Sequence, residues 1–274
     1  LRKIKNGFVE NGFNEVLSYS LVPEENDKLI KISNPLLLET SCLRDNIWKE
    51  HLEIVNRNIK AGQTSCYVFE VGNVFYNNSE FVQEEILNGA IFGNKKFGKW
   101  VSSARDNDLN YYQARGKLKE ALACLNIKIE DKPIDSIDFL HPGRTAKLLI
   151  EGKDAGYFGE IHPKLILEKK AIKKVYLFSI NLSNLLLAST RKNKWIPIYK
   201  QYPTVPKMDR DINFIFSKKY LVSEIISVIR KTGKNLLEAV NLIDVFEDSN
   251  LGDDFVSYTF RLSYRDKDKT LLDS

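Results

Sequence analysis

The chain has 274 residues, 43% of them hydrophobic and 11% aromatic, which is enough to form a substantial core and argues against intrinsic disorder. Its formal net charge of +5 is compatible with a polyanionic partner without requiring one, and no segment approaches the roughly 20 apolar residues that a membrane-spanning helix needs. The three cysteines lack the spacing of a disulfide framework or a zinc site, which favours a reducing compartment.

Helices and strands alternate along the first half of the chain. Apolar residues at helical spacing predict helices over residues 1–11 and 48–61, each followed by a glycine that ends it. Residues 13–21 have the β-branched and aromatic content of a strand. Residues 65–75 predict a strand buried on both faces, and residues 89–92 a further short strand.

The next part of the chain continues this mixed pattern. Residues 111–126 predict a second long helix. Residues 145–150 and 156–160 predict a hairpin that turns at Gly152. A short helix is expected after Pro163, and residues 175–187 predict a strand that leads into a turn or short helix.

A change of composition suggests a domain boundary. Residues 190–206 are rich in basic residues and contain three of the eight prolines. We therefore expect a first domain at 1–190, a basic linker at 191–206 and a second domain at 207–274. The second domain has the order β-α-β-β, with the helix predicted at 220–231. A ferredoxin-like unit is β-α-β-β-α-β, so this domain is expected to be truncated.

Catalytic and metal-binding patterns are missing from the sequence. None of the three histidines lies near a serine or cysteine in a nucleophile context such as GxSxG. His141 and His162 each precede a proline and have no second ligand at helical spacing, and His51 adjoins an apolar helix face. The sequence therefore predicts no catalytic residue and no metal ligand.

The second domain is the better candidate for binding RNA. Its predicted strands carry aromatic and arginine side chains, which are Phe214, Phe246, Tyr258, Phe260, Tyr264, Arg210, Arg261 and Arg265. Aromatic rings on an open antiparallel sheet stack on unpaired bases. Alternation places Ser257 and Arg261 on one face and Phe260 on the other, so we expect the first face to meet solvent or RNA and the second to form core.

Five blocks in fixed order resemble one family. They are SNPLLLETSCLRDNIWKEHLEIVNRN at 33–58, YVFEVGNVFY at 67–76, DFLHPGRTAKLLIEGKDAGYFGEIHP at 138–163, YPTVPKMDRDI at 202–212 and IDVFEDSNLGDDFVSYTFRLSYRDKDKTLLD at 243–273. Together they resemble the C-terminal part of the β subunit of bacterial or plastid phenylalanine–tRNA ligases. The resemblance implies an α+β fold class: a class II synthetase-like antiparallel sheet domain that is non-catalytic, then a truncated ferredoxin-fold anticodon-binding domain.

The resemblance also bears on catalysis. In active class II domains, a strand of this kind continues into an arginine that holds the α-phosphate of ATP. Here the matching residues are Val74-Phe75-Tyr76-Asn77, and neither Tyr76 nor Asn77 supplies the cation that a phosphate needs. No cofactor is therefore expected to bind this chain. ATP and Mg²⁺ are expected to serve the whole enzyme, with the chemistry in a separate α chain.

Binding residues follow from the family pattern. The family's anticodon contacts match Asp244, Phe246, which stands where tyrosine is usual, and Ser257, and Arg210 is expected to add a phosphate contact. Around the block that begins at Ser33, the contacts expected with the α subunit of an α2β2 assembly involve Arg44, Trp48, Leu52 and Val55. Packing of these side chains within their own domain is an equal alternative.

The expected function is subunit assembly and binding of tRNA(Phe), with no membrane association, in a bacterial cytoplasm or a chloroplast stroma. Two alternatives remain open at this point. One is an RNA-binding module that acts alone, which would bind anticodon-loop RNA without a partner. The other is an active class II-like ligase, which would bind ATP.

Overall fold

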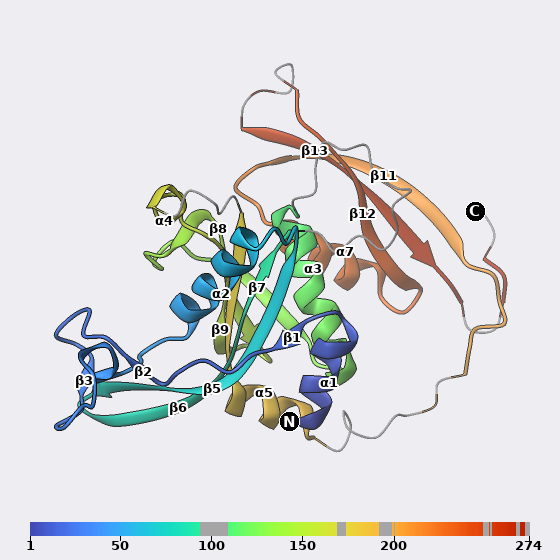
Figure 1. Ribbon diagram of the computed structural model, residues 1–274. Helices are drawn as coiled ribbons and strands as arrows, with labels where there is room; N and C mark the ends of the chain where they lie inside the picture. Colours follow the sequence, from blue (N-terminus) through green and yellow to red (C-terminus); the bar gives the residue numbers. More distant parts are fainter. Residues whose placement is uncertain are drawn as a thin grey trace. The chain divides into compact units, whose positions relative to one another are not determined.

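The computed structural model describes residues 1–93, 109–168, 174–191, 199, 201–248, 252, 254–266 and 269–271. The chain forms two compact units, Leu1–Ile198 and Tyr199–Ser274 (Figure 1). Residues 192–198 and 200 of the predicted linker lie outside the described residues, so the two units are described separately.

A seven-stranded sheet forms the centre of unit 1, in the order β1-β5-β6-β10-β9-β8-β7. Its strands are β1 (Asn14–Glu15), β5 (Cys66–Asn78), β6 (Glu80–Phe92), β7 (Ile129–Pro133), β8 (Leu140–Ile150), β9 (Lys153–Ile161) and β10 (Val175–Asn181). β1 runs parallel to β5, and the other neighbouring strands are antiparallel. The predicted hairpin is confirmed as β8 and β9, which are longer than expected.

Helices cover both faces of this sheet (Figure 1). α1 (Arg2–Glu10), α3 (Tyr111–Leu122) and α5 (Leu182–Ser189) pack on one face, where they bury Phe69 of β5. α2 (Trp48–Lys60) packs on the other, against Val68 of the same strand. Because neighbouring residues of a strand point to opposite faces, both faces of β5 are buried over its first half, as predicted.

Short elements complete unit 1. They are the 3₁₀ helices η1 (Leu38–Thr40) and η2 (Ala123–Leu125), the helix α4 (Pro163–Glu168), and a small sheet of β2 (Leu21–Val22), β4 (Cys42–Leu43) and β3 (Ile30–Lys31). The predicted glycine stops are confirmed, because Gly12 and Gly62 follow α1 and α2 with a φ of 83°, which favours glycine. No described helix is long and apolar enough to cross a membrane.

Two strand predictions in unit 1 were wrong in extent. The segment 13–21 pairs only through β1 and β2, and Leu17 and Tyr19 between them are 90% and 85% exposed, so their apolar character marks a surface. The strand predicted at 89–92 is the end of the 13-residue β6. The first half of β6 carries several charged residues and is mostly exposed, so the sequence shows no strand pattern there. Hydrogen bonding to β5 keeps this half extended.

Unit 2 contains a three-stranded antiparallel sheet in the order β11-β13-β12. Its elements are β11 (Met208–Ser217), α7 (Val222–Gly233), β12 (Leu237–Phe246) and β13 (Phe255–Tyr264). The predicted β-α-β-β order is confirmed. α7 packs on one face of the sheet, where Ile225 joins Val240, Phe260 and Leu262 in a small core. The polar residues of β13, such as Thr259 and Arg261, lie on the opposite face of the sheet.

Candidate functional sites

The polar face of the unit 2 sheet has its own hydrogen-bond network between β11 and β13. Arg261 donates to both carboxylate oxygens of Asp211, at 2.8 and 2.7 Å, and this contact lowers the pKa of Asp211. Ser257 donates to Asn213 at 3.0 Å, and Asn213 in turn donates to Thr259 at 2.8 Å. These side chains lie on the face away from α7, which confirms the predicted division of β13 into a polar face and a core face.

A β-bulge controls which residues of β12 share this face. Leu242 lies opposite Phe260, but Asp244 lies opposite the preceding residue, Thr259, so Ile243 is an extra residue in β12. Strict alternation from Leu242 would point Asp244 toward α7. The bulge instead aligns Asp244 with Thr259, on the polar face.

The structure brings together three of the four residues that were expected to contact the anticodon. Phe246 lies directly opposite Ser257, two residues along β12 from Asp244 and on the same face, and it is 53% exposed. Arg210 instead lies opposite Leu262 and therefore on the α7 side of the edge strand β11. Ser257 is only 8% exposed and donates to Asn213, so its hydroxyl is already in use.

An exposed apolar residue of this site was missed. Ile215 lies opposite Ser257 on β11 and is 57% exposed. Alternation along 210–216 could have placed it on this face. We call the surface formed by Ile215, Asp244, Phe246, Ser257 and Thr259 the open face. It combines apolar area that can stack on bases with a carboxylate that can accept hydrogen bonds from a base edge.

In unit 1, Arg44 is buried in an ion-pair network, with 2% of its surface exposed. Its Nη2 lies 2.9 Å from Glu70 Oε1, its Nη1 donates to Ser18 Oγ at 2.8 Å, and its Nε donates to the carbonyl of Asn73 at 2.9 Å. Because the guanidinium is already surrounded by acceptors of its own domain, Arg44 holds this region together.

Glu70 is the acidic partner and is 1% exposed. Burial acts to raise its pKa, but the nearby His51 ring, the hydrogen bonds from Ser18 and Arg44 and the positive charge of Arg44 outweigh burial and lower the pKa to about 2. His51 Nε2 is 3.5 Å from Glu70 Oε2, which is long for a hydrogen bond, so Ser18 and Arg44 supply the main stabilisation.

The other residues expected at a subunit interface also pack within unit 1. Leu52 and Val55 are 3% and 0% exposed and face the sheet. Trp48 is partly exposed and stacks on Phe139, with ring centroids 4.4 Å apart and planes at 9°. The surface of α2 that faces the sheet is therefore covered by unit 1 itself. Contact of α2 with a partner subunit stays a prediction, and it concerns the surface of α2 that faces away from the sheet.

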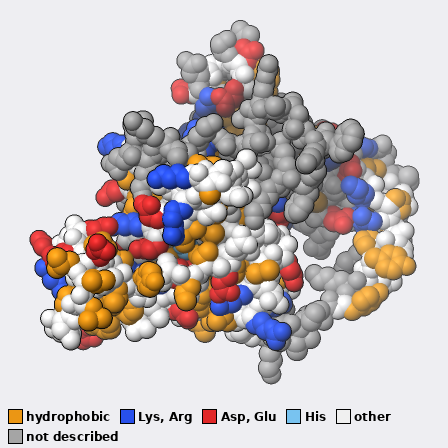
Figure 2. Space-filling model, viewed as in Figure 1, with side chains coloured by type: hydrophobic (Ala, Val, Ile, Leu, Met, Phe, Trp, Pro, Cys, Tyr) orange, Lys and Arg blue, Asp and Glu red, His pale blue; other side chains and the backbone are white. Residues whose placement is uncertain are grey.

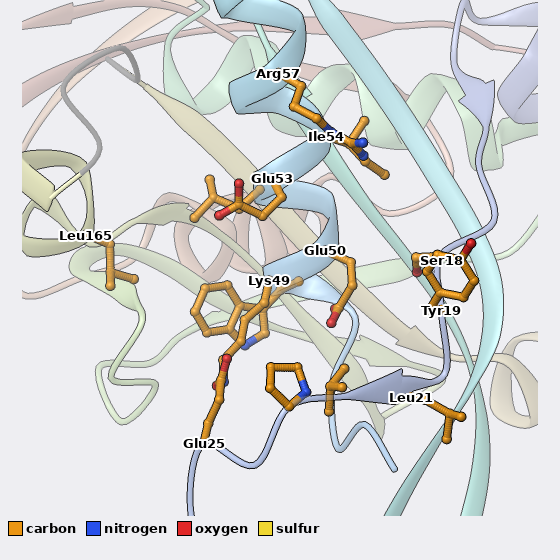
Figure 3. A pocket seen from close by; sticks show the side chains of 14 residues that line it. Ser18, Tyr19, Leu21, Glu25, Lys49, Glu50, Glu53, Ile54, Arg57 and Leu165 are labelled. Carbon is orange, nitrogen blue, oxygen red and sulfur yellow. The ribbon is translucent and has the colours of Figure 1, made fainter. Parts of the chain in front are cut away.

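A groove lies along that outer surface. It has a volume of about 590 Å³ and lies between α2 and the segment of β2, with Leu165 on its far side (Figure 3). Figure 3 shows Lys49, Glu50 and Arg57 of α2 among its lining residues. Oε2 of Glu50 is buried and has no hydrogen-bond partner among the described residues, and burial raises the pKa of this carboxyl.

Apolar side chains are exposed near the groove. Figure 2 shows hydrophobic atoms gathered over the region of β2, β3 and β4. We call three consecutive exposed leucines of this region the apolar patch: Leu36, Leu37 and Leu38. Leu36 is 97% exposed and Leu38 is 86% exposed. Several large apolar side chains exposed in one region are typical of a surface that another protein covers.

Tyr76 and Asn77, which stand where active class II domains have an ATP-binding arginine, lie at the end of β5. Tyr76 donates from its hydroxyl to Glu84 Oε2 at 2.9 Å, and Asn77 is exposed. The chain then turns sharply at Ser79, which has a φ of 63°. Tyr76 and Glu84 line a cavity of about 400 Å³, and no lysine or arginine is among the described residues that line it.

Comparison with known proteins relates the fold to the aminoacyl-tRNA synthetases. The chain is similar in fold to a pyrrolysyl tRNA synthetase from Desulfitobacterium hafniense, with a TM-score of 0.50 and 10% identity over 68% of this chain and 64% of that one. Residues 1–182 match the model of the phenylalanyl tRNA synthetase beta chain CLM domain, and residues 203–274 match that of the ferredoxin-fold anticodon binding domain. The chain therefore belongs to the phenylalanyl-tRNA synthetase β-chain family.

Sequence relatives agree. The chain is 81% identical over its whole length to a phenylalanine–tRNA ligase beta subunit from Prochlorococcus marinus strain MIT 9312, and 43% identical over 99% of its length to one from Synechococcus strain CC9902. Each match spans 34% of the relative, so the chain corresponds to about a third of these subunits. The expected family and the expected α+β fold class are confirmed.

Proposed function

We propose that the chain supplies tRNA-binding and assembly surfaces to a phenylalanine–tRNA ligase, which joins phenylalanine to tRNA(Phe) using ATP. The observation that carries this proposal is the open face, where Asp244 and Phe246 lie together on the part of the chain that matches an anticodon-binding model. Its cyanobacterial relatives favour a bacterial cytoplasm over a chloroplast stroma.

The second role is assembly with an α subunit, in the α2β2 form of the enzyme. The apolar patch and the groove beside α2 support it, because both belong to the unit that matches the β-chain model and leave apolar surface exposed. Mixing the chain with the α chain and measuring co-elution by size-exclusion chromatography tests this role. A correctly folded chain that does not co-elute would contradict it.

Charged residues in the apolar patch should break this assembly. We expect the double variant Leu37→Glu/Leu38→Glu to weaken association with the α chain by at least ten-fold, since each carboxylate would be removed from water at the interface. Its melting temperature should stay near that of the wild type, because both side chains are exposed. Leu187→Glu, which changes a leucine that is 69% exposed on α5, is the matched control and should associate normally.

Adenylation is proposed to take place in the α chain. The cavity beside Tyr76 is lined by acidic and amide side chains, an environment that repels phosphate, and no group of three or more candidate metal ligands occurs among the described residues. Calorimetric titration of the isolated chain with ATP and Mg²⁺ should therefore give no saturable heat. Clear binding would instead favour an active class II-like ligase.

A further inference from the structure

The cavity beside Tyr76 has a polar floor that neither proposed role uses. It lies on the side of the seven-stranded sheet that faces α2, between β6, β10 and β9. Asn88, Ser179 and Tyr157 are cross-strand neighbours on these three strands and form a continuous row of polar side chains across the floor. Asn88 and Ser179 are buried, with 1% and 8% of their surfaces exposed.

Two amide oxygens around this cavity lack hydrogen-bond donors. Oδ1 of Asn88 and Oδ1 of Asn46 are both buried, and neither has a partner among the described residues. Most buried polar atoms in proteins are paired, because an unpaired one has lost its water without compensation. Two unpaired acceptors in one cavity therefore point to a ligand that brings N–H or O–H donors.

The charge of the lining favours a cation. Glu84 accepts hydrogen bonds from the Tyr76 hydroxyl and the Asn181 side-chain amide, which are neutral and leave its negative charge uncompensated. Asp45 and Asp154 add two carboxylates, of which Asp154 pairs with Lys147 at 2.6 Å. A phosphate or carboxylate would be repelled here, whereas an ammonium group offers three donors and a compensating charge.

We propose that this cavity is a binding site for a small organic amine, whose ammonium group donates to Asn88 Oδ1 and is attracted by the carboxylate of Glu84. A volume of about 400 Å³ suits an amine of a few carbon atoms. The site is independent of the open face and of the apolar patch, so it stands or falls separately from the function proposed above.

Calorimetry at constant ionic strength, with 1,4-diaminobutane as the probe, tests the proposal. We expect saturable binding by the wild-type chain and no binding of 1,4-butanediol, which has the same length without charge. Asn88→Leu removes the acceptor at nearly constant volume, and Glu84→Gln removes the charge. Each variant should bind at least ten-fold more weakly. Asp135→Asn changes an exposed carboxylate outside the cavity and should leave binding unchanged.

The location of the probe can be read directly. In an NMR titration, the side-chain amide signals of Asn88 should shift with the same saturation as the calorimetric heat. Absence of saturable binding, equal binding of the diol, or wild-type affinity in both variants would overturn the proposal. A titration with potassium chloride that gives the same saturable heat as diaminobutane would also overturn it, since a general ionic effect would then explain the heat. Should Asn88→Leu fail to fold, Glu84→Gln still decides the outcome.

Discussion

Replacing Arg44 with methionine should lower the free energy of unfolding of unit 1 by about 3–5 kcal/mol, because it leaves the buried carboxylate of Glu70 without its cation. Urea denaturation measures the change. The control is Arg191→Met, which breaks an ion pair with Glu151 in which the Arg191 side chain is 59% exposed, and should cost less than about 1 kcal/mol.

The ion pair can be separated from the volume of its side chains. In the double variant Arg44→Met/Glu70→Leu, both charges are replaced by apolar groups, and we expect much of the lost stability to return. If Arg44→Met alone were as stable as the wild type, the buried network would not be what holds the segment around Ser18 to β5.

The same network should set part of the acid sensitivity. The pKa of Glu70 is about 2 in the folded chain, below the ordinary value of 4.5, so its stabilising effect is fully present above about pH 4.5 and is lost as the pH falls toward 2. Glu70→Gln should be less stable at pH 7 and should show a shallower loss of stability between these two pH values. Unfolding curves recorded across this range compare the two chains.

Replacing Phe246 with alanine should weaken binding of the anticodon stem-loop of tRNA(Phe) by about 1–3 kcal/mol, since a base that stacks on the ring loses that contact. Fluorescence anisotropy of a labelled stem-loop at fixed salt measures the affinity. Tyr112→Ala removes an aromatic ring of unit 1 that is 83% exposed and should have no effect. Equal losses in the two variants, or none in Phe246→Ala, would contradict a role for the open face.

Arg210 tests the other side of the same sheet. It lies on the α7 side of an edge strand, so its proposed contact is with phosphate from the edge and not with a base on the open face. Arg210→Ala should therefore weaken binding of all RNA sequences similarly and reduce the slope of affinity against salt concentration by about one.

Local patterns predicted much of the fold. The helix stops at Gly12 and Gly62 and the β-α-β-β order of unit 2 depend on neighbouring residues, and they are present as expected. Alternation also assigned the two faces of β13 correctly, because this strand has α7 on one side only.

Features that depend on distant residues could not be predicted in this way. Burial of Arg44 requires Glu70, 26 residues away along the chain, and Ser18 on a different segment. The exposure of Leu17 and Tyr19 depends on the chain leaving the sheet after β1. The bulge at Ile243 exchanges the faces to which the following residues of β12 point. Alternation along the strand would therefore have placed Asp244 on the α7 side, and only the family pattern suggested it as a binding residue.

The most direct test of the tRNA-binding role is a residue-by-residue NMR titration of the isotope-labelled chain with the anticodon stem-loop of tRNA(Phe). The account predicts that the signals of Ile215, Asp244, Phe246 and Thr259 on the open face shift together, whereas those of the exposed side of α7, such as Val228, stay in place. Shifts confined to α7, or no shifts in unit 2 at saturating RNA, would contradict the account.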